Sequence, residues 1–470
     1  MNSSLIVKGS LTTYLVISLV MRHNFFKIHP RRIFLSLVAG IFWNIYNMKK
    51  KPSPPSRTRV AKRFRQTGPS SAEAWAKLRA LAGQPGIINL GQGFPDFIPM
   101  PEAIDFAKQA MDKPELNQYA SMGGSIRLKK ALSAYYGKAP SRDAVGSGSA
   151  AVSLPFDPNT EITVTTSGTE AVYCIFQALV NPGDTVVVME PSFPWYSPAI
   201  KLAGGIPLTI ELQPPTFSIL HHDTLRKLRS VFDSCRPKII VVNTPHNPTG
   251  HVMTAEELDE IEALCLKYKT IIVSDEVYER CIFDGHRLES VRHRRHLASN
   301  TLTIGSSSKL LSMTGWRVGW VLGNAEFIRA IKVSSGYTTF CAPTPFQDAC
   351  AAILEKSMKT RDWSFGNVSS LFSINFQRLK DALESIGLIV CAAEGGYFLT
   401  ADVTSTQMTD MEFVEHLAET CKIAALPMRL FYQDPPKNGR ALVRFAVCKK
   451  EQTILKTVDA LKLFVSAPSS

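Results

Sequence analysis

Lys309 is the residue whose surroundings most clearly indicate chemistry. It follows an apolar run that ends at Ile304, and the segment between them, Gly305 to Ser308, contains one glycine and three serines. Arg317 follows eight residues later, within Gly-Trp-Arg-Val-Gly. Small residues let the backbone approach a ligand closely, and a lysine amine placed there can form a Schiff base with a carbonyl. The serine hydroxyls and the guanidinium suit the oxygens of a phosphate.

A Schiff-base lysine with phosphate ligands around it is the combination that pyridoxal phosphate needs. The competing interpretation is a serine-rich surface turn with a solvated lysine. The two differ in what the rest of the chain must supply: the first needs other elements that bring polar and aromatic groups to the same place.

The elements that must position Lys309 alternate between strand and helix from residue 161 onward. Strands are predicted over 161–165, 185–189, 206–212, 238–243, 270–273 and 302–304, with helices up to Leu179 and over 255–268. Such alternation predicts a mainly parallel sheet with helices on both faces. Ligands bind beyond the carboxyl ends of the strands in such sheets. The residues just past these predicted ends are Ser167, Phe193, Asn247, Asp275 and Lys309.

The segments on either side of this alternation predict a smaller second domain. Before it lie predicted helices over 71–81, 101–111 and 126–136, a short strand over 87–90 and a loop over 138–158. After a helix near 347–358, the pattern predicts an α+β unit with helices over 367–383 and 411–421, strands at 397–399 and 441–446, and a terminal helix to Val465. No internal repeat is present. The predicted organisation is therefore an extension over 1–70, a first part of the small domain over 71–115, a large domain over 116–355 and the rest of the small domain over 356–470.

The net charge of +13 belongs to the N-terminal segment. No Asp or Glu precedes Glu73, whereas thirteen Lys and Arg do, so the remaining forty basic residues equal the forty acidic ones. Apolar content of 45% is ordinary for a globular protein. The nine cysteines include no Cys-x-x-Cys and no metal-like spacing, which predicts buried thiols in a reducing compartment and no metal site.

Residues 1–70 have the composition of a targeting segment. Two apolar runs, 11–21 and 33–46, are each shorter than the roughly 20 residues of a spanning helix. A basic, serine-containing and acid-free segment is typical of an organelle transit peptide, which predicts a plastid or mitochondrial location and a mature N-terminus between residues 45 and 75. A membrane-proximal anchor, or translation from Met48 and a cytoplasmic location, are the alternatives; a membrane association of the mature domain is not expected.

Five motifs in order give the chain from about residue 75 to 465 a specific resemblance. They are Asn89–Phe97 (Asn-Leu-Gly-Gln-Gly-Phe-Pro-Asp-Phe), Asn243–Gly250 (Asn-Thr-Pro-His-Asn-Pro-Thr-Gly), Ser274–Tyr278 (Ser-Asp-Glu-Val-Tyr), the Lys309 segment and Val443–Ala446 (Val-Arg-Phe-Ala). Together they resemble class I aminotransferases of PLP fold type I, and within them the kynurenine/glutamine aminotransferase branch, which includes cysteine-S-conjugate β-lyases. The resemblance implies an α/β three-layer fold with a mainly parallel large-domain sheet and a smaller α+β domain.

The resemblance also implies a role for each matching residue. Lys309 would hold pyridoxal 5′-phosphate and shuttle the substrate Cα proton, with Asp275 pairing with the pyridinium nitrogen and Tyr278 contacting the ring O3′. The other implied cofactor ligands are Ser167, Gly168, Thr169, Phe193, Asn247, Ser306 and Arg317, together with Tyr119, which would reach the phosphate of a neighbouring subunit and so imply a homodimer. The implied substrate ligands are Gly93, Asn247 and Arg444, with Arg444 binding the α-carboxylate.

Each of these residues also has a structural interpretation. Asn247 could simply form an Asn-Pro turn, Phe193 and Tyr278 could be core aromatics, and Arg444 could lie on the surface of a strand. The motifs depart from the family at Ser307, where an apolar residue, Thr, Ala or Cys is usual, and at Thr169, where relatives can carry an aromatic residue.

The predicted function is a PLP-dependent aminotransferase. It would move the amino group of an L-amino acid (kynurenine, glutamine, methionine or an aromatic one) to a 2-oxo acid. A β-lyase acting on cysteine S-conjugates could use the same lysine and ring. A DNA-binding regulator with a silent catalytic domain is a third hypothesis that the basic segment invites, but no helix-turn-helix pattern accompanies it, so no nucleic-acid partner is expected.

Overall fold

The computed structural model describes residues 61, 69–98, 100–137, 155–283, 285–294, 296–360, 368–435 and 439–464. All described residues except residue 61 belong to one compact unit, Lys62–Ser470. The expected targeting segment over 1–70 and most of the loop expected over 138–158 lie outside the described residues. Among the described helices none is both long and apolar enough to cross a membrane.

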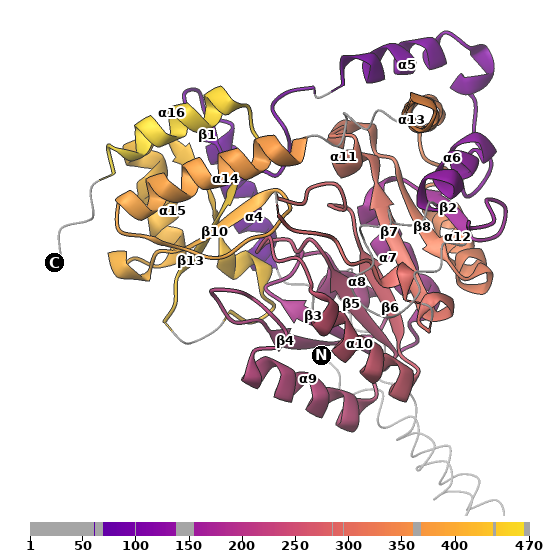
Figure 1. Ribbon diagram of the computed structural model, residues 1–470, viewed down its shortest axis with the longest axis horizontal. Helices are drawn as coiled ribbons and strands as arrows, with labels where there is room; N and C mark the ends of the chain where they lie inside the picture. The colour runs from indigo at the N-terminus through magenta and orange to yellow at the C-terminus, as the bar shows by residue number, and fades with distance from the viewer. Residues whose placement is uncertain are drawn as a thin grey trace, which may run out of the picture. The chain divides into compact units, whose positions relative to one another are not determined.

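A seven-stranded sheet forms the centre of this unit (Figure 1). Its strands in spatial order are β2 (Ile162–Thr165), β8 (Gly319–Gly323), β7 (Thr301–Ser306), β6 (Ile271–Asp275), β5 (Ile239–Asn243), β3 (Thr185–Glu190) and β4 (Ile206–Glu211). β8 alone runs in the opposite direction to the other six strands. The expected mainly parallel sheet is confirmed, and the carboxyl ends of β3, β5, β6 and β7 lie along one edge.

Helices cover both faces of this sheet because its strands are apolar on both sides. Val186, Val188, Ile239 and Val241 pack with one set of helices, whereas the alternating Val187, Met189, Ile240 and Val242 pack with another. The first set is α7 (Ser167–Leu179), α8 (Tyr196–Leu202) and α12 (Ala325–Thr338), and the second is α9 (His222–Cys235) and α10 (Ala255–Tyr268). Three layers result, each strand filling both cores through its period of two.

Local sequence fixes where several helices begin. Thr254 and Glu257 form a reciprocal capping box at the start of α10, and Ser125 caps α6 (Ile126–Tyr136) by accepting a hydrogen bond from the backbone N–H of Leu128. Both helices have the bounds that the apolar spacing predicts.

A second, antiparallel sheet belongs to the C-terminal part of the chain. Its order is β12 (Leu426–Pro427), β13 (Leu442–Ala446), β10 (Phe398–Asp402) and β9 (Ile389–Val390), and β1 (Ile88–Asn89) pairs separately with β11 (Ile423–Ala424). The accompanying helices are α4 (Pro69–Ala82), α14 (Val368–Ser385), α15 (Asp410–Cys421) and α16 (Glu451–Leu461). Figure 1 shows α14 and α16 side by side over this sheet. The pairing of β1 with β11 joins the segment near residue 88 to the C-terminal part, although the division at residues 115 and 355 stays a prediction.

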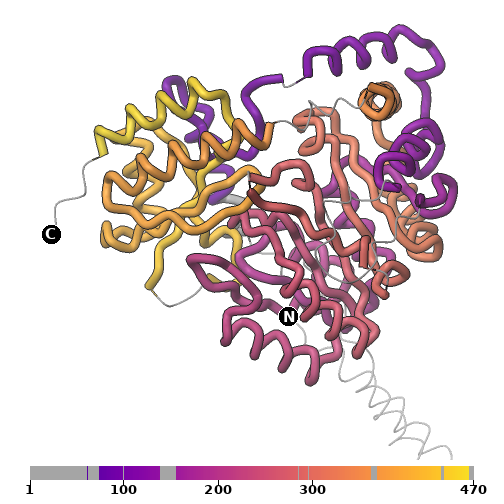
Figure 2. The backbone as a smooth tube through the Cα atoms, viewed as in Figure 1, coloured from indigo at the N-terminus to yellow at the C-terminus, as the bar shows by residue number. Residues whose placement is uncertain are grey.

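A third cluster packs against the β2 and β8 edge of the large sheet. It combines α5 (Pro101–Met111) and α6 with α13 (Thr344–Thr360), which come from distant parts of the sequence but lie side by side (Figure 2). Trp320 of β8 is fully buried within it. The strand β8 and the helices α8, α9 and α12 were not predicted, because β8 is a short glycine-bounded segment directly after the candidate site motif and its apolar residues read as part of that motif.

Candidate functional site

One cavity collects most of the residues that the sequence singles out. It has a volume of about 430 Å³ and lies at the carboxyl edge of the large sheet. The predicted residues that line it are Gly93, Ser167, Gly168, Thr169, Phe193, Asn247, Asp275, Tyr278, Ser306, Lys309, Arg317 and Arg444. Tyr119 is the one predicted residue that does not line this cavity: it is 85% exposed and its ring contacts Phe340.

Lys309 lies one turn past the end of β7, in the short helix α11 (Ser307–Leu310). Its Nζ donates a hydrogen bond to the carbonyl oxygen of Gly93 at 2.8 Å and lies 4.6 Å from the ring centre of Tyr397. Burial, with the nearby charges of Arg444 and Arg317, lowers the pKa of the Lys309 ammonium to about 8. The interpretation as a solvated surface lysine is therefore wrong, and this amine has an unusually accessible neutral form.

Asp275 is the last residue of β6, and its carboxylate is buried. Its Oδ2 accepts a hydrogen bond from the hydroxyl of Tyr196 at 2.6 Å, and its Oδ1 accepts one from the backbone N–H of Val277 at 3.3 Å. Burial raises the pKa of Asp275 to about 6 even though both hydrogen bonds favour the charged form. A cation placed against this carboxylate would bring the pKa down again, which is what a protonated ring nitrogen can do.

Asn243 links Asp275 to the Asn247 loop. The two strands β5 and β6 place Asn243 directly opposite Asp275 in register. The Asn243 amide donates to the carbonyl oxygen of Asp275 at 2.9 Å, and its Oδ1 accepts from the backbone N–H of Asn247 at 2.9 Å. The loop that carries Asn247 is therefore fixed to the strand that carries Asp275.

The start of α7 offers an anion site made of backbone amides. Ser167, Gly168 and Thr169 are its first residues, and the positive end of the helix dipole lies there. The Glu170 carboxylate holds this turn by accepting hydrogen bonds from the backbone of Thr166 and from the hydroxyls of Ser335 and Thr339 of the neighbouring α12 segment.

The strand β8 approaches this turn so closely that Gly319 is required. A Cβ at Gly319 would lie 2.3 Å from the carbonyl carbon of Ser167. Arg317 precedes it in a left-handed conformation, with φ of 53°, and its guanidinium donates to the carbonyl of Thr314 at 3.0 Å while lying exposed at the cavity wall. Arg317 and the first residues of α7 line the same cavity, so the guanidinium could contribute to binding a phosphate at the helix start.

The serines before Lys309 divide into bonded and unbonded hydroxyls. Ser306 accepts a hydrogen bond from the backbone N–H of Ser308 at 3.2 Å, and Ser307, the departure from the family pattern, is fully buried and donates to the carbonyl of Val318 at 2.9 Å. Ser308 Oγ is buried, lines the cavity and has no hydrogen-bond partner among the described residues. Buried hydroxyls normally have a partner, so this group points to a ligand.

Arg444 of β13 brings a second buried cation into the cavity. Its Nη1 donates to Asn247 Oδ1 and its Nη2 to the carbonyl of Gly91, both at 2.9 Å, and its guanidinium lies 3.7 Å from the ring centre of Phe398. Arg444 Nε has no partner within the described part of the chain. Burial lowers the pKa of Arg444, which means that a carboxylate would be a favourable additional partner. The interpretation as an exposed strand arginine is wrong.

Four successive carbonyls, from Gly91 to Phe94, accept hydrogen bonds from three cationic side chains. Arg444 contacts the first, Lys309 the third, and the buried Lys449 the second and fourth at 3.2 and 2.9 Å. The loop after β1 is thereby held against the two cations that face the cavity. A Cβ at Gly93 would lie 2.4 Å from Phe398 Cζ, so this position needs glycine for close approach.

Aromatic rings form one wall of the cavity. Phe193 stacks on Trp195 with ring centres 5.0 Å apart and contacts Tyr196 edge-on at 5.5 Å. Tyr278 is buried and its ring lies 5.0 Å from that of Tyr397. Phe193 and Tyr278 thus pack with the core and also line the cavity. Their interpretations as core aromatics and as cofactor contacts are therefore compatible.

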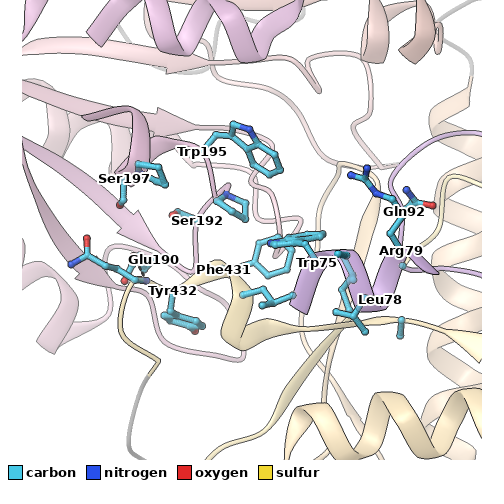
Figure 3. A pocket seen from close by; sticks show the side chains of 18 of the residues that line it. Trp75, Leu78, Arg79, Gln92, Glu190, Ser192, Trp195, Ser197, Phe431 and Tyr432 are labelled. Atoms are coloured by element: carbon cyan, nitrogen blue, oxygen red, sulfur yellow. Dashed lines mark hydrogen bonds between the residues drawn. The ribbon is translucent and has the colours of Figure 1, made fainter. Parts of the chain in front are cut away.

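A second, larger cavity of about 620 Å³ adjoins the first (Figure 3). The two cavities share Trp75, Trp195 and Phe431 among their lining residues. The Trp75 ring contacts those of Trp195 and Phe431 edge-on at 6.2 and 6.0 Å. An aromatic passage therefore connects the space near Lys309 with a wider one.

The residues present fit pyridoxal phosphate. One cavity is lined by the Lys309 amine, the buried Asp275 carboxylate and the first residues of α7 with their backbone amides. Ser308 and Arg444 line it too, and their Oγ and Nε atoms have no partner among the described residues. The same arrangement offers a carboxylate-binding guanidinium next to the amine. In the described residues no group of three or more His, Cys, Asp or Glu is placed to hold a metal ion.

A sequence profile of the family described as aminotransferase class I and II matches residues 85–461. The chain belongs to this aminotransferase family. It is a PLP-dependent transferase, and the expected family resemblance, enzyme class and cofactor are confirmed.

Relatives of this aminotransferase carry several substrate names. Kynurenine–oxoglutarate transaminase 3 of Rattus norvegicus is 34% identical over 401 residues, covering 81% of this chain and 85% of the relative. The probable N-succinyldiaminopimelate aminotransferase DapC of Mycobacterium tuberculosis is 32% identical over 413 residues, covering 86% of this chain and 98% of the relative.

Solved structures confirm the fold of the aminotransferase. The N-succinyldiaminopimelate aminotransferase of M. tuberculosis matches with a TM-score of 0.75 at 33% identity, covering 86% of this chain and 99% of that one. YbdL of Escherichia coli, described as having a methionine aminotransferase function, matches with a TM-score of 0.74 at 28% identity, covering 88% and 100%. The three-layer α/β architecture of PLP fold type I is thus shown.

Several cavity residues were missed by sequence reasoning. Tyr196 follows Phe193 by three residues and could have been found from the helical spacing after the Phe-Pro turn. Trp75, Arg79 and Phe431 come from elements far apart in the chain, so no local pattern connects them. Ser308 was read as part of a small-residue run, and nothing in that run distinguishes it from Ser307.

Proposed function

We propose that this aminotransferase moves the amino group of an L-amino acid with a large uncharged side chain to a 2-oxo acid. Kynurenine, methionine and the aromatic amino acids are the preferred donors, with glutamine as the polar member of the set. The main support for this proposal is the buried Arg444 guanidinium, because it lines the same cavity as the Lys309 amine. Trp75, Trp195 and Phe431, which form the aromatic passage, line that cavity as well. The names of the relatives, which include kynurenine and methionine, support the same donor class.

In the proposed mechanism Lys309 moves the proton of the substrate. When bound, pyridoxal phosphate supplies an electron sink for the carbanion that forms as the Cα proton leaves. Lys309 Nζ takes that proton, for which its lowered pKa of about 8 is suited, since a sizeable fraction is neutral near neutral pH. Asp275 would hold a proton on the ring nitrogen, and Tyr278 and Asn247 would donate to the ring oxygen.

Substrate carboxylate binding falls to Arg444. Its unpaired Nε–H and the Nη1 that already bonds Asn247 would donate to the two oxygens of the α-carboxylate in a bidentate arrangement. The hydrogen bond from Lys309 to the carbonyl of Gly93 sets the amine and the Gly93 backbone side by side, so the carboxylate and the Cα proton are presented together. The phosphate would lie on the α7 start with Ser167, Gly168, Thr169, Ser306 and Arg317.

The donor side chain would extend along Trp75 and Phe431. Three aromatic rings at edge-on and stacked distances provide a flat apolar lining that suits an aromatic or thioether side chain. Burial of such a side chain against these rings would contribute roughly 1.5–3 kcal/mol.

The decisive experiment is a panel of amino acids and 2-oxo acids on purified holoenzyme, with product analysis. Formation of a new oxo acid and a new amino acid supports the proposal, whereas pyruvate plus a thiol from a cysteine S-conjugate indicates β-elimination on the same site. Arg444→Ala should raise the KM for amino acids by about 30-fold or more, since truncating one member of a buried charge pair costs about 2–5 kcal/mol. An unchanged KM rejects the carboxylate role of Arg444.

The role of Lys309 is tested by removing its amine. Lys309→Ala should abolish transamination and leave the cofactor bound only noncovalently, so that it is removed by gel filtration. Lys380→Ala, a change at a half-buried position of α14 that does not line the cavity, is the matched control and should keep covalent attachment. Activity in Lys309→Ala near that of the wild type would reject the assignment.

We further propose a homodimer in which Tyr119 completes the phosphate site of the neighbouring subunit. Its exposure of 85% leaves the hydroxyl available to a second chain. Sedimentation should give a dimer, and the Tyr119→Phe homodimer should bind the cofactor more weakly than the wild type. In a heterodimer of Tyr119→Phe with Lys309→Ala, the site that keeps Lys309 receives Tyr119 from the other subunit, so its cofactor affinity should return to that of the wild type. A monomer with full activity contradicts this arrangement.

We propose an organelle location on the composition of residues 1–70, which lie outside the described structure except for residues 61, 69 and 70. Terminal sequencing of protein from its own cell should find a start between residues 45 and 75. An intact Met1 end in the mature protein rejects processing.

A further inference from the structure

Arg79 of α4 lines both cavities, so its guanidinium lies along the space that a substrate side chain would occupy. The residue is exposed, and its guanidinium has no hydrogen-bond or ion-pair partner in the described part of the chain, although its backbone carbonyl accepts from Gly83. It stands on the same helix as Trp75, one turn along, so the cation and the aromatic wall come from one element. Figure 3 shows Arg79 beside Gln92 at one end of the larger cavity.

The charge of this cavity is asymmetric. Glu190 lies at the opposite end of the view, near Tyr432, and its Oε1 accepts the backbone N–H of Gln433 at 2.8 Å. Lys201 also lines the cavity on that side, where it contributes to the field around Glu190. Of these three charged residues only Arg79 lines the cofactor cavity as well.

We propose that Arg79 is a specificity-determining residue that binds a distal carboxylate on the substrate side chain, and so admits dicarboxylic substrates to a site otherwise lined for apolar ones. The inference rests on the proposed function, because it assumes that the α-carboxylate lies on Arg444. A guanidinium matches a carboxylate bidentately, and a neutral donor that fills the aromatic passage does not need it. In a ping-pong cycle both substrates use this space, so the class most affected is the 2-oxo dicarboxylic acceptor.

The geometry restricts where such an anion can lie. A side chain that starts at the Lys309 cavity reaches Arg79 and Gln92 before it reaches Glu190, since the first two line both spaces. A carboxylate pushed deeper would meet the Glu190 carboxylate and be repelled. Short and medium dicarboxylic acids are therefore favoured over longer ones.

The experiment compares acceptors in the intact holoenzyme, with kynurenine or methionine as the fixed donor. Arg79→Gln should lower kcat/KM for 2-oxoglutarate about tenfold, mostly through KM, because one charge-assisted pair is lost. The same variant should change kcat/KM for the uncharged 4-methylthio-2-oxobutanoate less than twofold. Arg79→Lys should restore part of the preference for 2-oxoglutarate because it keeps the positive charge.

Two controls separate the possible results. Lys77→Gln removes a cation two residues away on α4 that pairs with Glu415 outside the cavity, and the ratio of the two acceptors should not change. If Lys201→Gln, and not Arg79→Gln, abolishes the preference for 2-oxoglutarate, Arg79 is not the determinant and the inference is overturned.

If Arg79→Gln still transaminates with an unchanged ratio of kcat/KM between the two acceptors, this inference alone fails. If no donor and acceptor react, the proposed function itself fails.

Discussion

The hydroxyl of Tyr196 donates a 2.6 Å hydrogen bond to Oδ2 of Asp275, and both side chains are buried. Tyr196 opens α8 and Asp275 closes β6, so the bond connects a helix on one face of the sheet with the strand edge where the cofactor would lie. This bond lowers the pKa of Asp275 against the larger opposing effect of burial. The Tyr196 hydroxyl therefore favours the charged form of Asp275 and partly offsets the effect of burial, as a protonated ring nitrogen would also do.

Tyr196→Phe should therefore raise the pKa of Asp275. The acid limb of the kcat profile should move to higher pH, and the cofactor should bind about tenfold more weakly, since a hydrogen bond to a charged group contributes roughly 1.5–3 kcal/mol. A pH profile and fluorescence titration of the apoenzyme measure both. Tyr268→Phe, which removes a surface tyrosine hydroxyl bonded to Asp233, is the control and should leave both unchanged.

Lys449 holds the Gly91–Phe94 loop through two buried hydrogen bonds. Lys449→Met keeps the length of the side chain but removes the ammonium, so Gln92 and Phe94 lose their donor. We expect the KM for amino acids to rise about tenfold with a smaller change in kcat, because the loop positions the substrate carboxylate site without contacting the reacting atoms. Lys450→Met, at the next and exposed position, should behave as the wild type. A fall in thermal stability with an unchanged KM would leave Lys449 a structural role only.

Gly93→Ala tests the close approach of the loop to Phe398. The added Cβ would overlap the Phe398 ring edge, and that ring lies under the Arg444 guanidinium. We predict a rise in KM of about tenfold or more, as expected for overpacking that costs 1–3 kcal/mol. The double variant Gly93→Ala, Phe398→Leu should recover part of the loss, since the space for Cβ is restored. Equal losses in the single and double variants would show that backbone conformation, not the ring, is limiting.

His251 should make stability depend on pH. Its ring bonds Glu257 at 2.8 Å and Glu394 at 3.2 Å, and these carboxylates come from α10 and from the loop before β10. Burial by itself lowers the pKa of His251, but the two carboxylates outweigh it and raise the pKa to about 9. Because the folded pKa is raised, the stabilisation is complete below about pH 6.5 and is lost as the pH rises to about 9.

The unfolding free energy of the wild type minus that of His251→Asn should shrink by about 3 kcal/mol between pH 6.5 and 9. Urea denaturation at a series of pH values measures it. His246→Asn, a change five residues earlier in the same loop, is the control, because burial lowers the pKa of His246 to about 3 and it stays neutral over this range. A parallel pH dependence in the two variants would contradict an ion pair at His251.

The sequence alone determined the chemistry of the site and the class of the fold. Lys309, Asp275 and Asn247 follow apolar strand patterns, and carboxyl ends of parallel strands meet along one edge, so these residues could be brought together without coordinates. The family resemblance then gave Arg444 its role, which the buried guanidinium beside the cavity supports. The helix bounds of α6 and α10 likewise follow from local capping and spacing.

Tertiary structure decided what lies opposite these groups. The cavities bring together Tyr196 from α8, Trp75 and Arg79 from α4, and Phe431 from the segment Met428–Phe431. No periodicity within one segment encodes a contact between three segments that lie far apart in the sequence. The pKa values of Asp275 and Lys309 are likewise set by burial, which depends on how the layers pack. Local interactions determine which segment becomes a strand or helix, whereas long-range packing determines which polar groups lose water and which partners they find.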